Sequence, residues 1–431
     1  GALNKLETII GADTATFTCT AVSEIPQSEC QALVDLYLNT NGAGWTNQLG
    51  WLSTSTPCQW YGVGCSNGHV IDLNLHNNRL VGTLPATIEN LSYLVWLILS
   101  DNRLTATLPV TLGNLSRLES LDLYRNQLTG AIPPALGNLA NLIFLSLGEN
   151  QFTGEVPSQL GNLTKLEYLY LPHNQLTGSI PAAIGQLHNL RELTMEDNQL
   201  QGSIPTTLGN LVYLTKLYLW VNQLEGLIPA SLSNLTQLQV LSLSDNQLSG
   251  AIPPELGLLT ALQELTLSNN QLTGSIPVAL GALPNLRALY LGNNRLTGGI
   301  PPTLGNLVNL QHLTLYNNTL QGGIPPELGN LPALEELDLG GVGLTGAIPS
   351  SLTQLGELRK LVLWDNQFQG EIPVALSNLT KLQVLALSDN KFSGAMPTGL
   401  TMLPALTELY LSNNELNGSL PATLGNLTDV I

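Results

Sequence analysis

The sequence repeats itself every 24 residues between Asn78 and Asn414. Steps of 24 residues from Asn78 reach fifteen positions, and fourteen of them are asparagine, with Val342 as the exception. Around each asparagine the repeat reads LxLxxNxLxGxIPxxLGNLxxLxx. A fixed period of this length is typical of a stack of identical supersecondary units rather than of one globular core.

Each position of the repeat predicts a local structure. The two leucines before the asparagine, such as Leu121 and Leu123, alternate with other residues, which predicts a short strand with one buried face. The proline seven residues after the asparagine cannot lie inside a central strand, so the chain is expected to reverse on its outer side. The glycine four residues after the asparagine predicts a turn where a Cβ would be crowded, with Ala106 as the exception. The asparagine is expected to face inward and to pair backbone groups of the loop.

A single repeat buries too few apolar side chains to offset the entropy lost in ordering its backbone. Repeats must therefore stack, which pairs their strands into one parallel sheet at about 4.8 Å per strand, or roughly 70 Å in all. The strand side and the proline side differ in width, so the sheet is expected to curve. The repeat at Val342 has three glycines around the lost asparagine and is expected to have a looser ladder of hydrogen bonds.

These residues resemble the leucine-rich repeat family, in particular its plant-type class of 24 residues with the signature LxGxIPxxLGNL, over about residues 67 to 431. The resemblance implies an α/β solenoid, a right-handed superhelical horseshoe with a parallel concave β-sheet of about fifteen strands. It also implies that the concave sheet binds a protein, peptide or glycan. We expect residues 67–431 to form fifteen full repeats and a partial sixteenth.

Residues 1–66 are expected to form a disulfide-stabilised cap with one helix. Ser28-Glu29-Cys30-Gln31 has the form of a capping box, which predicts that a helix starts there and ends near Asn41-Gly42. A turn at Asn67-Gly68 then leads to the first repeat strand, near Val70 to Leu75. A cap is needed because the first strand would otherwise expose a sheet edge.

All four cysteines lie within residues 19–65, which favours two disulfides and an oxidising compartment, with three pairings open. Residues 58–65 resemble the CxWxGVxC amino-terminal cap of plant-type repeat proteins, and the residues before them resemble caps of secreted microbial and algal members. This resemblance favours a bond between Cys58 and Cys65, which leaves Cys19 with Cys30. A zinc site has little support, because there is no CxxC pair and His69 is the only nearby imidazole.

Charge and hydropathy exclude several classes of partner. With 31 acidic and 14 basic residues the net charge is -17, which argues against nucleic acid and anionic membranes as partners. The charge serves either solubility or attraction to basic partners. No run of 18 apolar residues is present, so no membrane span is expected. We expect a secreted or cell-surface location. The C-terminal end lacks a polar cap or a cysteine pair, so either a cap follows it or another molecule covers it.

The positions six, four and two residues before each repeat asparagine should point out of the concave face. They hold half of the 22 aromatic residues of the chain: Trp96, Tyr124, Phe144, Tyr168, Tyr170, Tyr218, Trp220, Tyr290, Tyr316, Trp364 and Tyr410. Aromatic side chains rimmed by charge are typical of binding hot spots. The predicted ligand site comprises Tyr124, Phe144, Tyr168, Tyr170, Glu192, Glu196, Lys216, Tyr218 and Trp220. The competing interpretation is that these rings only stabilise neighbouring strands, and the smaller cluster of Tyr290, His312 and Tyr316 is interpreted as incidental.

The leading hypothesis is a secreted or surface-displayed recognition module that binds a protein or peptide, with basic residues favoured. The alternatives are an adhesive or structural protein that self-assembles through its C-terminal end, and a glycan-binding or ice-binding surface. We expect no enzyme activity, cofactor or metal, because the five histidines are scattered and no HExxH, GxSxG or phosphate-loop motif is present.

Overall fold

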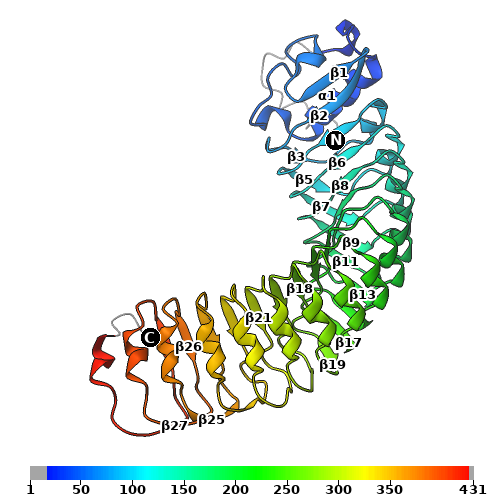
Figure 1. The fold of residues 1–431 in the computed structure, drawn as a ribbon. Helices are drawn as coiled ribbons and strands as arrows, with labels where there is room; N and C mark the ends of the chain where they lie inside the picture. The colour runs from blue at the N-terminus through cyan, green and yellow to red at the C-terminus, as the bar shows by residue number, and fades with distance from the viewer. Residues whose placement is uncertain (1–16, 427–431) are drawn as a thin grey trace, which may run out of the picture. The chain divides into compact units, whose positions relative to one another are not determined.

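A computed structural model of the chain describes residues 17–426. Within these residues the chain divides into an N-terminal body that ends at Phe152 and a C-terminal body that begins at Thr153. Figure 1 shows short strands stacked side by side along each body. In each body, one strand per repeat belongs to the main sheet and one short 3₁₀-helix lies after the proline.

The main sheet of the N-terminal body consists of β1 (Val63–Ser66), β2 (His69–Asn74), β4 (Trp96–Ile98), β6 (Ser120–Asp122) and β8 (Phe144–Ser146). That of the C-terminal body consists of β10 (Tyr168–Tyr170), β12 (Glu192–Thr194), β14 (Lys216–Tyr218), β16 (Val240–Ser242), β18 (Glu264–Thr266), β20 (Ala288–Tyr290), β21 (His312–Thr314), β22 (Glu336–Asp338), β24 (Lys360–Val362), β26 (Val384–Ala386) and β28 (Glu408–Tyr410). Within each body the repeat strands pair in parallel, each residue with the one 24 positions on, as Leu217 does with Leu241. The solenoid with a parallel sheet is therefore confirmed.

The leucines of the repeat form the core of both bodies. Leu121, Leu123, Leu265 and Leu267 are fully buried, as are their counterparts in the neighbouring repeats. Because every strand pairs in the same register, each leucine packs against the equivalent leucine of the next repeat. The short strands are thus held by stacked apolar side chains on one face, and their other face remains available.

The outer side of the repeats carries 3₁₀-helices and a second set of short strands. The helices are η5 (Ala86–Asn90), η6 (Val110–Asn114), η7 (Pro134–Asn138), η8 (Ser158–Asn162), η9 (Ala182–Gln186), η10 (Thr206–Asn210), η11 (Ala230–Asn234), η12 (Pro254–Leu258), η13 (Val278–Ala282), η14 (Pro302–Asn306), η15 (Pro326–Asn330), η16 (Ser350–Gln354), η17 (Val374–Asn378), η18 (Thr398–Met402) and η19 (Ala422–Asn426). The outer strands are β3 (Val81–Gly82), β5 (Arg103–Ala106), β7 (Gln127–Ala131), β9 (Gln151–Glu155), β11 (Gln175–Thr177), β13 (Gln201–Ser203), β15 (Gln223–Leu227), β17 (Gln247–Ala251), β19 (Gln271–Thr273), β23 (Thr345–Gly346), β25 (Gln367–Glu371), β27 (Lys391–Gly394) and β29 (Glu415–Leu416). From η5 to η18 the repeat proline precedes the helix, as Pro253 does η12, where its carbonyl accepts the first helical hydrogen bond.

The repeat asparagine has the expected inward role. The side-chain nitrogen of Asn270 donates to the carbonyl oxygens of Leu243 and Leu267, at 3.0 and 3.1 Å, and its side-chain oxygen accepts from the backbone nitrogen of Leu248 at 2.9 Å. One buried amide thus satisfies three backbone groups in two repeats. At Val342 the ladder is looser, as expected, because valine has no amide to donate to the neighbouring carbonyls, but one bond is kept, since the nitrogen of Leu320 donates to the carbonyl oxygen of Val342 at 2.8 Å.

The position four residues after the asparagine needs a special backbone conformation in every described repeat, and the expected crowding is confirmed in some of them, as at Gly130, where a Cβ would lie 2.6 Å from Thr107. Gly370 has a φ of +85°, and a Cβ built on it would meet nothing within 4 Å. Its requirement is therefore a left-handed backbone rather than crowding. Crowding against backbone governs the glycine of the GN pair, since a Cβ on Gly161 would lie 2.4 Å from the carbonyl oxygen of Ala183.

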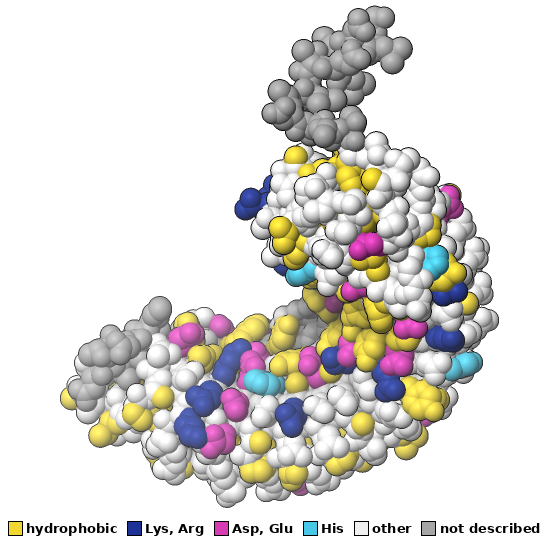
Figure 2. All heavy atoms as spheres, turned by 90° about the horizontal axis from the view of Figure 1, so that it is seen from above, with side chains coloured by type: hydrophobic (Ala, Val, Ile, Leu, Met, Phe, Trp, Pro, Cys, Tyr) yellow, Lys and Arg dark blue, Asp and Glu magenta, His cyan; other side chains and the backbone are white. Residues whose placement is uncertain are grey.

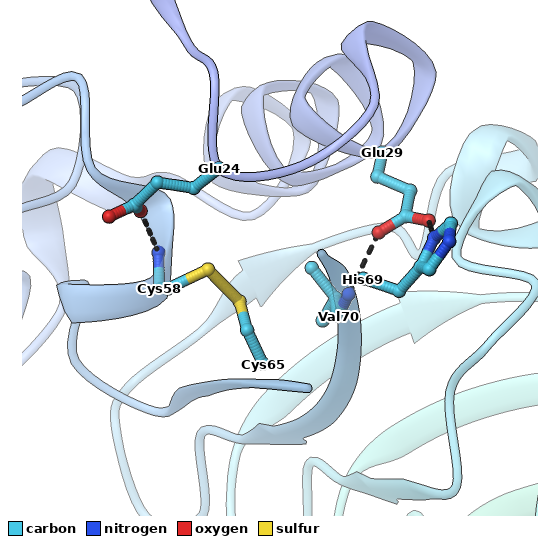
Figure 3. Close-up of a disulfide and its surroundings, with 6 residues drawn as sticks. All are labelled: Glu24, Glu29, Cys58, Cys65, His69 and Val70. Carbon is cyan, nitrogen blue, oxygen red and sulfur yellow. Dashed lines mark hydrogen bonds and ion pairs between the residues drawn. A yellow bond between two sulfur atoms is a disulfide. The ribbon is translucent and has the colours of Figure 1, made fainter. Parts of the chain in front are cut away.

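The cap contains α1 (Gln27–Asn39), η2 (Cys19–Ala21), η3 (Gly42–Gly44) and η4 (Pro57–Gln59). The capping-box prediction was wrong, because Pro26 precedes the helix and Ser28 lies inside its first turn without a capping hydrogen bond. Glu29 is instead buried, and its carboxylate accepts from the Val70 nitrogen at 2.8 Å and contacts His69 Nδ1 at 2.6 Å (Figure 3). This contact ties α1 to β2, the first strand of the repeat array.

Two disulfides hold the cap, one between Cys19 and Cys30 and one between Cys58 and Cys65 (Figure 3). This is the pairing that the resemblance favoured. Strands β1 and β2 form an antiparallel hairpin through a turn at residues 67–68, where both residues have positive φ. Because β1 pairs with β2, the cap covers the edge that the first repeat strand would otherwise expose. Among the described residues no helix is both long and apolar enough to cross a membrane.

Candidate ligand-binding site

The non-leucine side chains of the main strands point away from the core. In β10, Leu169 is fully buried, whereas Tyr168 and Tyr170 on either side of it are partly exposed. All eleven aromatic residues at the outward positions are at least partly exposed. We call the surface that they share within each body the sheet face.

In the N-terminal body, Tyr124 is held by charged neighbours. Its hydroxyl donates to Glu149, whose other carboxylate oxygen accepts from Arg125 Nε at 2.7 Å. Burial, together with the hydrogen bond to Glu149, raises the pKa of Tyr124 to about 12. Phe144, the other predicted site residue of this body, opens β8 and is partly exposed.

In the C-terminal body, Tyr170, Glu192 and Lys216 form one connected group. The hydroxyl of Tyr170 donates to Glu192 at 2.7 Å, and Lys216 Nζ lies 2.9 Å from the same carboxylate. Burial and then the hydrogen bond to Glu192 raise the pKa of Tyr170. The ring of Tyr168 lies 6.1 Å from that of Tyr170. Four of the predicted site residues are thus neighbours.

The remaining predicted residues lie on the following strands or just after them. One carboxylate oxygen of Glu196 is buried without a hydrogen-bond partner in the described part of the chain, and burial raises the pKa of this side chain. Trp220 meets the ring of His173 edge-on at 6.2 Å. Trp220 and Tyr218 are both partly exposed, and both line a hollow that extends towards the C-terminal end.

This hollow, which we call the central hollow, has a volume of about 520 Å³ and spans β14 to β24 on the sheet face. Its lining residues are Tyr218, Trp220, Ser242, Ser244, Asp245, Glu264, Thr266, Ser268, Tyr290, Thr314, Tyr316, Glu336, Asp338 and Lys360. Its space arises because short side chains lie between rings. Ser242 and Thr266 separate Tyr218 from Tyr290 along one row of the sheet. In the space-filling view, acidic and basic side chains lie beside one another among hydrophobic ones (Figure 2).

Hydroxyl groups form part of the floor of the central hollow. The hydroxyls of Ser242 and Thr266 lie 2.7 Å apart and bond to each other. Thr314 is only 5% exposed, and its hydroxyl has no hydrogen-bond partner among the described residues. A buried hydroxyl without a partner is uncommon, because leaving it unpaired costs free energy.

Charged groups of the central hollow are mostly paired. Lys360 Nζ lies 2.7 Å from Glu336 and 3.8 Å from Asp338, and His312 lies 3.3 Å from Glu336. Glu264 differs, because its side chain makes no hydrogen bond or ion pair to any residue that the structure describes. Burial raises the pKa of Glu264.

A second hollow of about 410 Å³ adjoins the central one and shares Asp338 and Lys360 with it. Its lining includes the apolar side chains of Val362, Trp364 and Val384. The ring of Trp364 lies over the glycines beside Val342, since a Cβ on Gly340 would be 2.5 Å from Trp364 Nε1. These glycines therefore make room for an aromatic side chain of the sheet face.

The sequence prediction missed part of this arrangement. Tyr290 and Tyr316 were interpreted as incidental, yet they line the central hollow together with Tyr218 and Trp220. The predicted ligand site also omits Glu264 and Lys360, which line the same hollow. A usable signal was present, namely the run of Ser, Thr and Gly at outward positions between aromatic residues, which leaves space once the repeats stack.

Comparisons with known proteins agree with the repeat pattern. A family described as a leucine-rich repeat region matches residues 69–203 and 300–430, and two further leucine-rich repeat families match residues 212–272 and 260–300. No curated protein matches the sequence.

Several solved structures are similar to the chain. The plant peptide hormone receptor RGFR1, in complex with RGF2, is 37% identical with a TM-score of 0.79, over 82% of this chain and 56% of the receptor chain. The ectodomain of the receptor kinase GASSHO1/SCHENGEN3 from Arabidopsis thaliana, in complex with CASPARIAN STRIP INTEGRITY FACTOR 2, is 38% identical with a TM-score of 0.82, over 93% and 52%. A leucine-rich repeat protein of Leptospira interrogans is 33% identical with a TM-score of 0.59, over 80% of this chain and 90% of that protein. The chain thus spans just over half the length of the two plant receptor chains.

Proposed function

Because this chain belongs to the leucine-rich repeat family, we propose that it is a non-catalytic recognition module that binds a peptide or an exposed protein segment on the sheet face of its C-terminal body. The observation that carries the proposal is the central hollow, with its four aromatic residues and partly buried charges. Rings beside desolvated charged groups are what binding hot spots consist of. The site differs from the predicted one in its centre, which lies further towards the C-terminus, and keeps Tyr218 and Trp220.

An extended peptide suits the shape of this surface. The central hollow is open and crosses several strands, and the second hollow continues it with apolar side chains. A chain lying across the strands could place successive side chains in both hollows. The similarity to a plant peptide hormone receptor in complex with RGF2 supports this ligand class.

An extracellular location is part of the proposal. Two disulfides hold the cap, and disulfides persist in oxidising compartments. The two similar plant structures are a receptor and the ectodomain of a receptor kinase, which favours an extracellular location for this chain.

Selection of peptides from a displayed random library tests the proposed function. We expect selected peptides to bind the wild-type chain and to lose about tenfold or more in affinity to Tyr316→Ala, because this ring lines the central hollow. Tyr213→Ala is the matched control, since Tyr213 is 47% exposed and does not line the hollow. Affinities are measured by biolayer interferometry. Peptides that bind Tyr316→Ala and the wild type equally, or a library that yields no binder, would contradict the proposal.

A further inference from the structure

We propose that Glu264 is the centre of a cation subsite in the central hollow, and that this subsite accepts an arginine side chain of the bound peptide. The inference rests on the function proposed above and names the chemistry of its ligand. It comes from three observations: an unpaired carboxylate, the rings around it, and a buried hydroxyl without a partner.

Four glutamates occupy the row to which Glu264 belongs, and Glu264 is the one whose side chain has no hydrogen bond or ion pair among the described residues, since even Glu408 accepts from the hydroxyl of Tyr410 at 3.2 Å. Glu192, at the equivalent position three repeats earlier, is paired with Lys216 at 2.9 Å. Glu336, three repeats later, is paired with Lys360 at 2.7 Å.

Glu264 has Val240 and Ala288 as its partners on the adjacent strands. Neither of these side chains can donate a hydrogen bond. His312, on the strand beyond Ala288, opposes the rise in the pKa of Glu264 through its charge, but its ion pair is with Glu336 at 3.3 Å. The carboxylate of Glu264 is half-buried in the hollow, where an unpaired charge is costly, so a cationic group from a ligand would be favourable there.

The surroundings of Glu264 favour a guanidinium group over a small ammonium group. Tyr218 and Tyr290 line the same hollow, and the charge of Glu264 contributes to raising the pKa of both, after burial as the larger cause. A guanidinium group is planar and weakly hydrated, stacks on aromatic faces, and presents several N–H donors to a carboxylate. Thr314, whose buried hydroxyl has no hydrogen-bond partner among the described residues, adds a polar group to the floor of the same hollow.

The charge balance of the central hollow points the same way. Four carboxylates line it, those of Asp245, Glu264, Glu336 and Asp338, against one ammonium group, that of Lys360. Lys360 is already engaged by Glu336 and Asp338. Within residues 17–426 no group of three metal-ligating side chains is present. An organic cation therefore matches the hollow better than an anion or a divalent ion.

Two small probes test the subsite without knowledge of the natural ligand. The first is N-acetyl-arginine methylamide, and the second is its citrulline analogue, which has nearly the same shape without the charge. Binding is followed by saturation-transfer NMR at probe concentrations up to about 10 mM, because a fragment of this size binds with roughly millimolar affinity. We expect the arginine probe to bind wild-type protein about tenfold or more tightly than the citrulline probe.

Two variants locate the binding. Glu264→Gln keeps the shape and removes the charge, and we expect it to bind the arginine probe about tenfold or more weakly. Glu255→Gln is the matched control, because it removes the same charge on η12, on the outer side of the adjoining repeat, and should bind like the wild type. Thermal unfolding checks that both variants fold.

Three results would overturn the inference: equal binding of the two probes, unchanged binding by Glu264→Gln, and no binding of the arginine probe to the wild type. Each is distinguishable from failure of the proposed function. If library peptides bind through Tyr316 but carry no arginine and ignore Glu264→Gln, the chain is still a peptide-binding module and only the cation subsite is wrong. If no peptide binds through Tyr316, the proposed function itself fails.

Discussion

The repeat asparagines show how one side chain can determine local structure. Each lies where a strand ends and the chain turns, so several backbone groups would be buried without partners there. At Asn270 the amide pairs with the carbonyls of Leu243 and Leu267 and with the nitrogen of Leu248, so two adjacent repeats depend on it. At Val342 a backbone carbonyl replaces the side-chain oxygen, which explains why a valine is tolerated at this one position.

Replacing Asn270 by valine should destabilise the repeats on both sides of it. The nitrogen of Leu248 would lose its acceptor, and each buried unpaired group costs about 1–3 kcal/mol. We expect faster amide hydrogen exchange at Leu248 and a lower unfolding midpoint in urea. Asn285→Ala is the control, because its amide donates to Thr260 on the exposed side, and its effect should be much smaller. Unchanged protection at Leu248 would contradict this role of the asparagine.

The outer turns of the repeats depend on backbone conformation more than on space. The fourth residue after the asparagine adopts positive φ in every described repeat, including Ala106 at +63°. A residue with a Cβ is strained in this region, by roughly 1–2 kcal/mol. The prediction from sequence identified the position correctly and only part of the reason, because sequence patterns show that glycine is preferred without showing whether φ or space demands it.

Ala106→Gly should therefore stabilise the protein by about 1 kcal/mol, since glycine adopts positive φ without strain. Ala131→Gly is the matched control, because Ala131 ends β7 with an ordinary backbone and its replacement should be neutral or destabilising. Differential scanning calorimetry of the two variants measures the change. A decrease in Tm for Ala106→Gly would show that the alanine is not strained.

At the scale of the whole molecule, stability is expected to be local, because each repeat contacts its neighbours in the stack. The cap is the part that departs from this regularity. Its tryptophans Trp45, Trp51 and Trp60 are buried against one another, with ring centroids 4.8 and 5.0 Å apart. Its disulfides span 11 and 7 residues, and loops of this length contribute about 2–3 kcal/mol each.

Replacing Cys58 and Cys65 by serine should loosen the cap and the first repeats without weakening the distant ones. We expect faster hydrogen exchange in β2 and β4. The reason is that β1, which covers the edge of β2, loses its disulfide crosslink at Cys65. Exchange in β24 and β26 of the C-terminal body should remain unchanged. Mass spectrometry of peptides after exchange measures both regions at once, and uniform loss of protection would instead indicate a single cooperative unit.

The sequence by itself determined the repeat, the strands, the buried leucines and the asparagine ladder. These features could be predicted because their contacts join a residue to a fixed position of the adjoining repeat, 24 residues away between strands and 22 or 27 residues away at the asparagines, so the period defines the neighbours. The outward rows of aromatic residues followed from the same alternation.

Only the tertiary structure decided where a ligand has room and how the cap is built. The volume of the central hollow depends on the summed volumes of side chains from successive strands. Ser242, Thr266 and Tyr290 therefore define it together, and none of them does so alone. The cap contacts, such as the one between Glu29 and His69, join residues at separations that no period predicts. Stacking converts a linear pattern into a surface, and the free space on that surface is a property of the packed side chains.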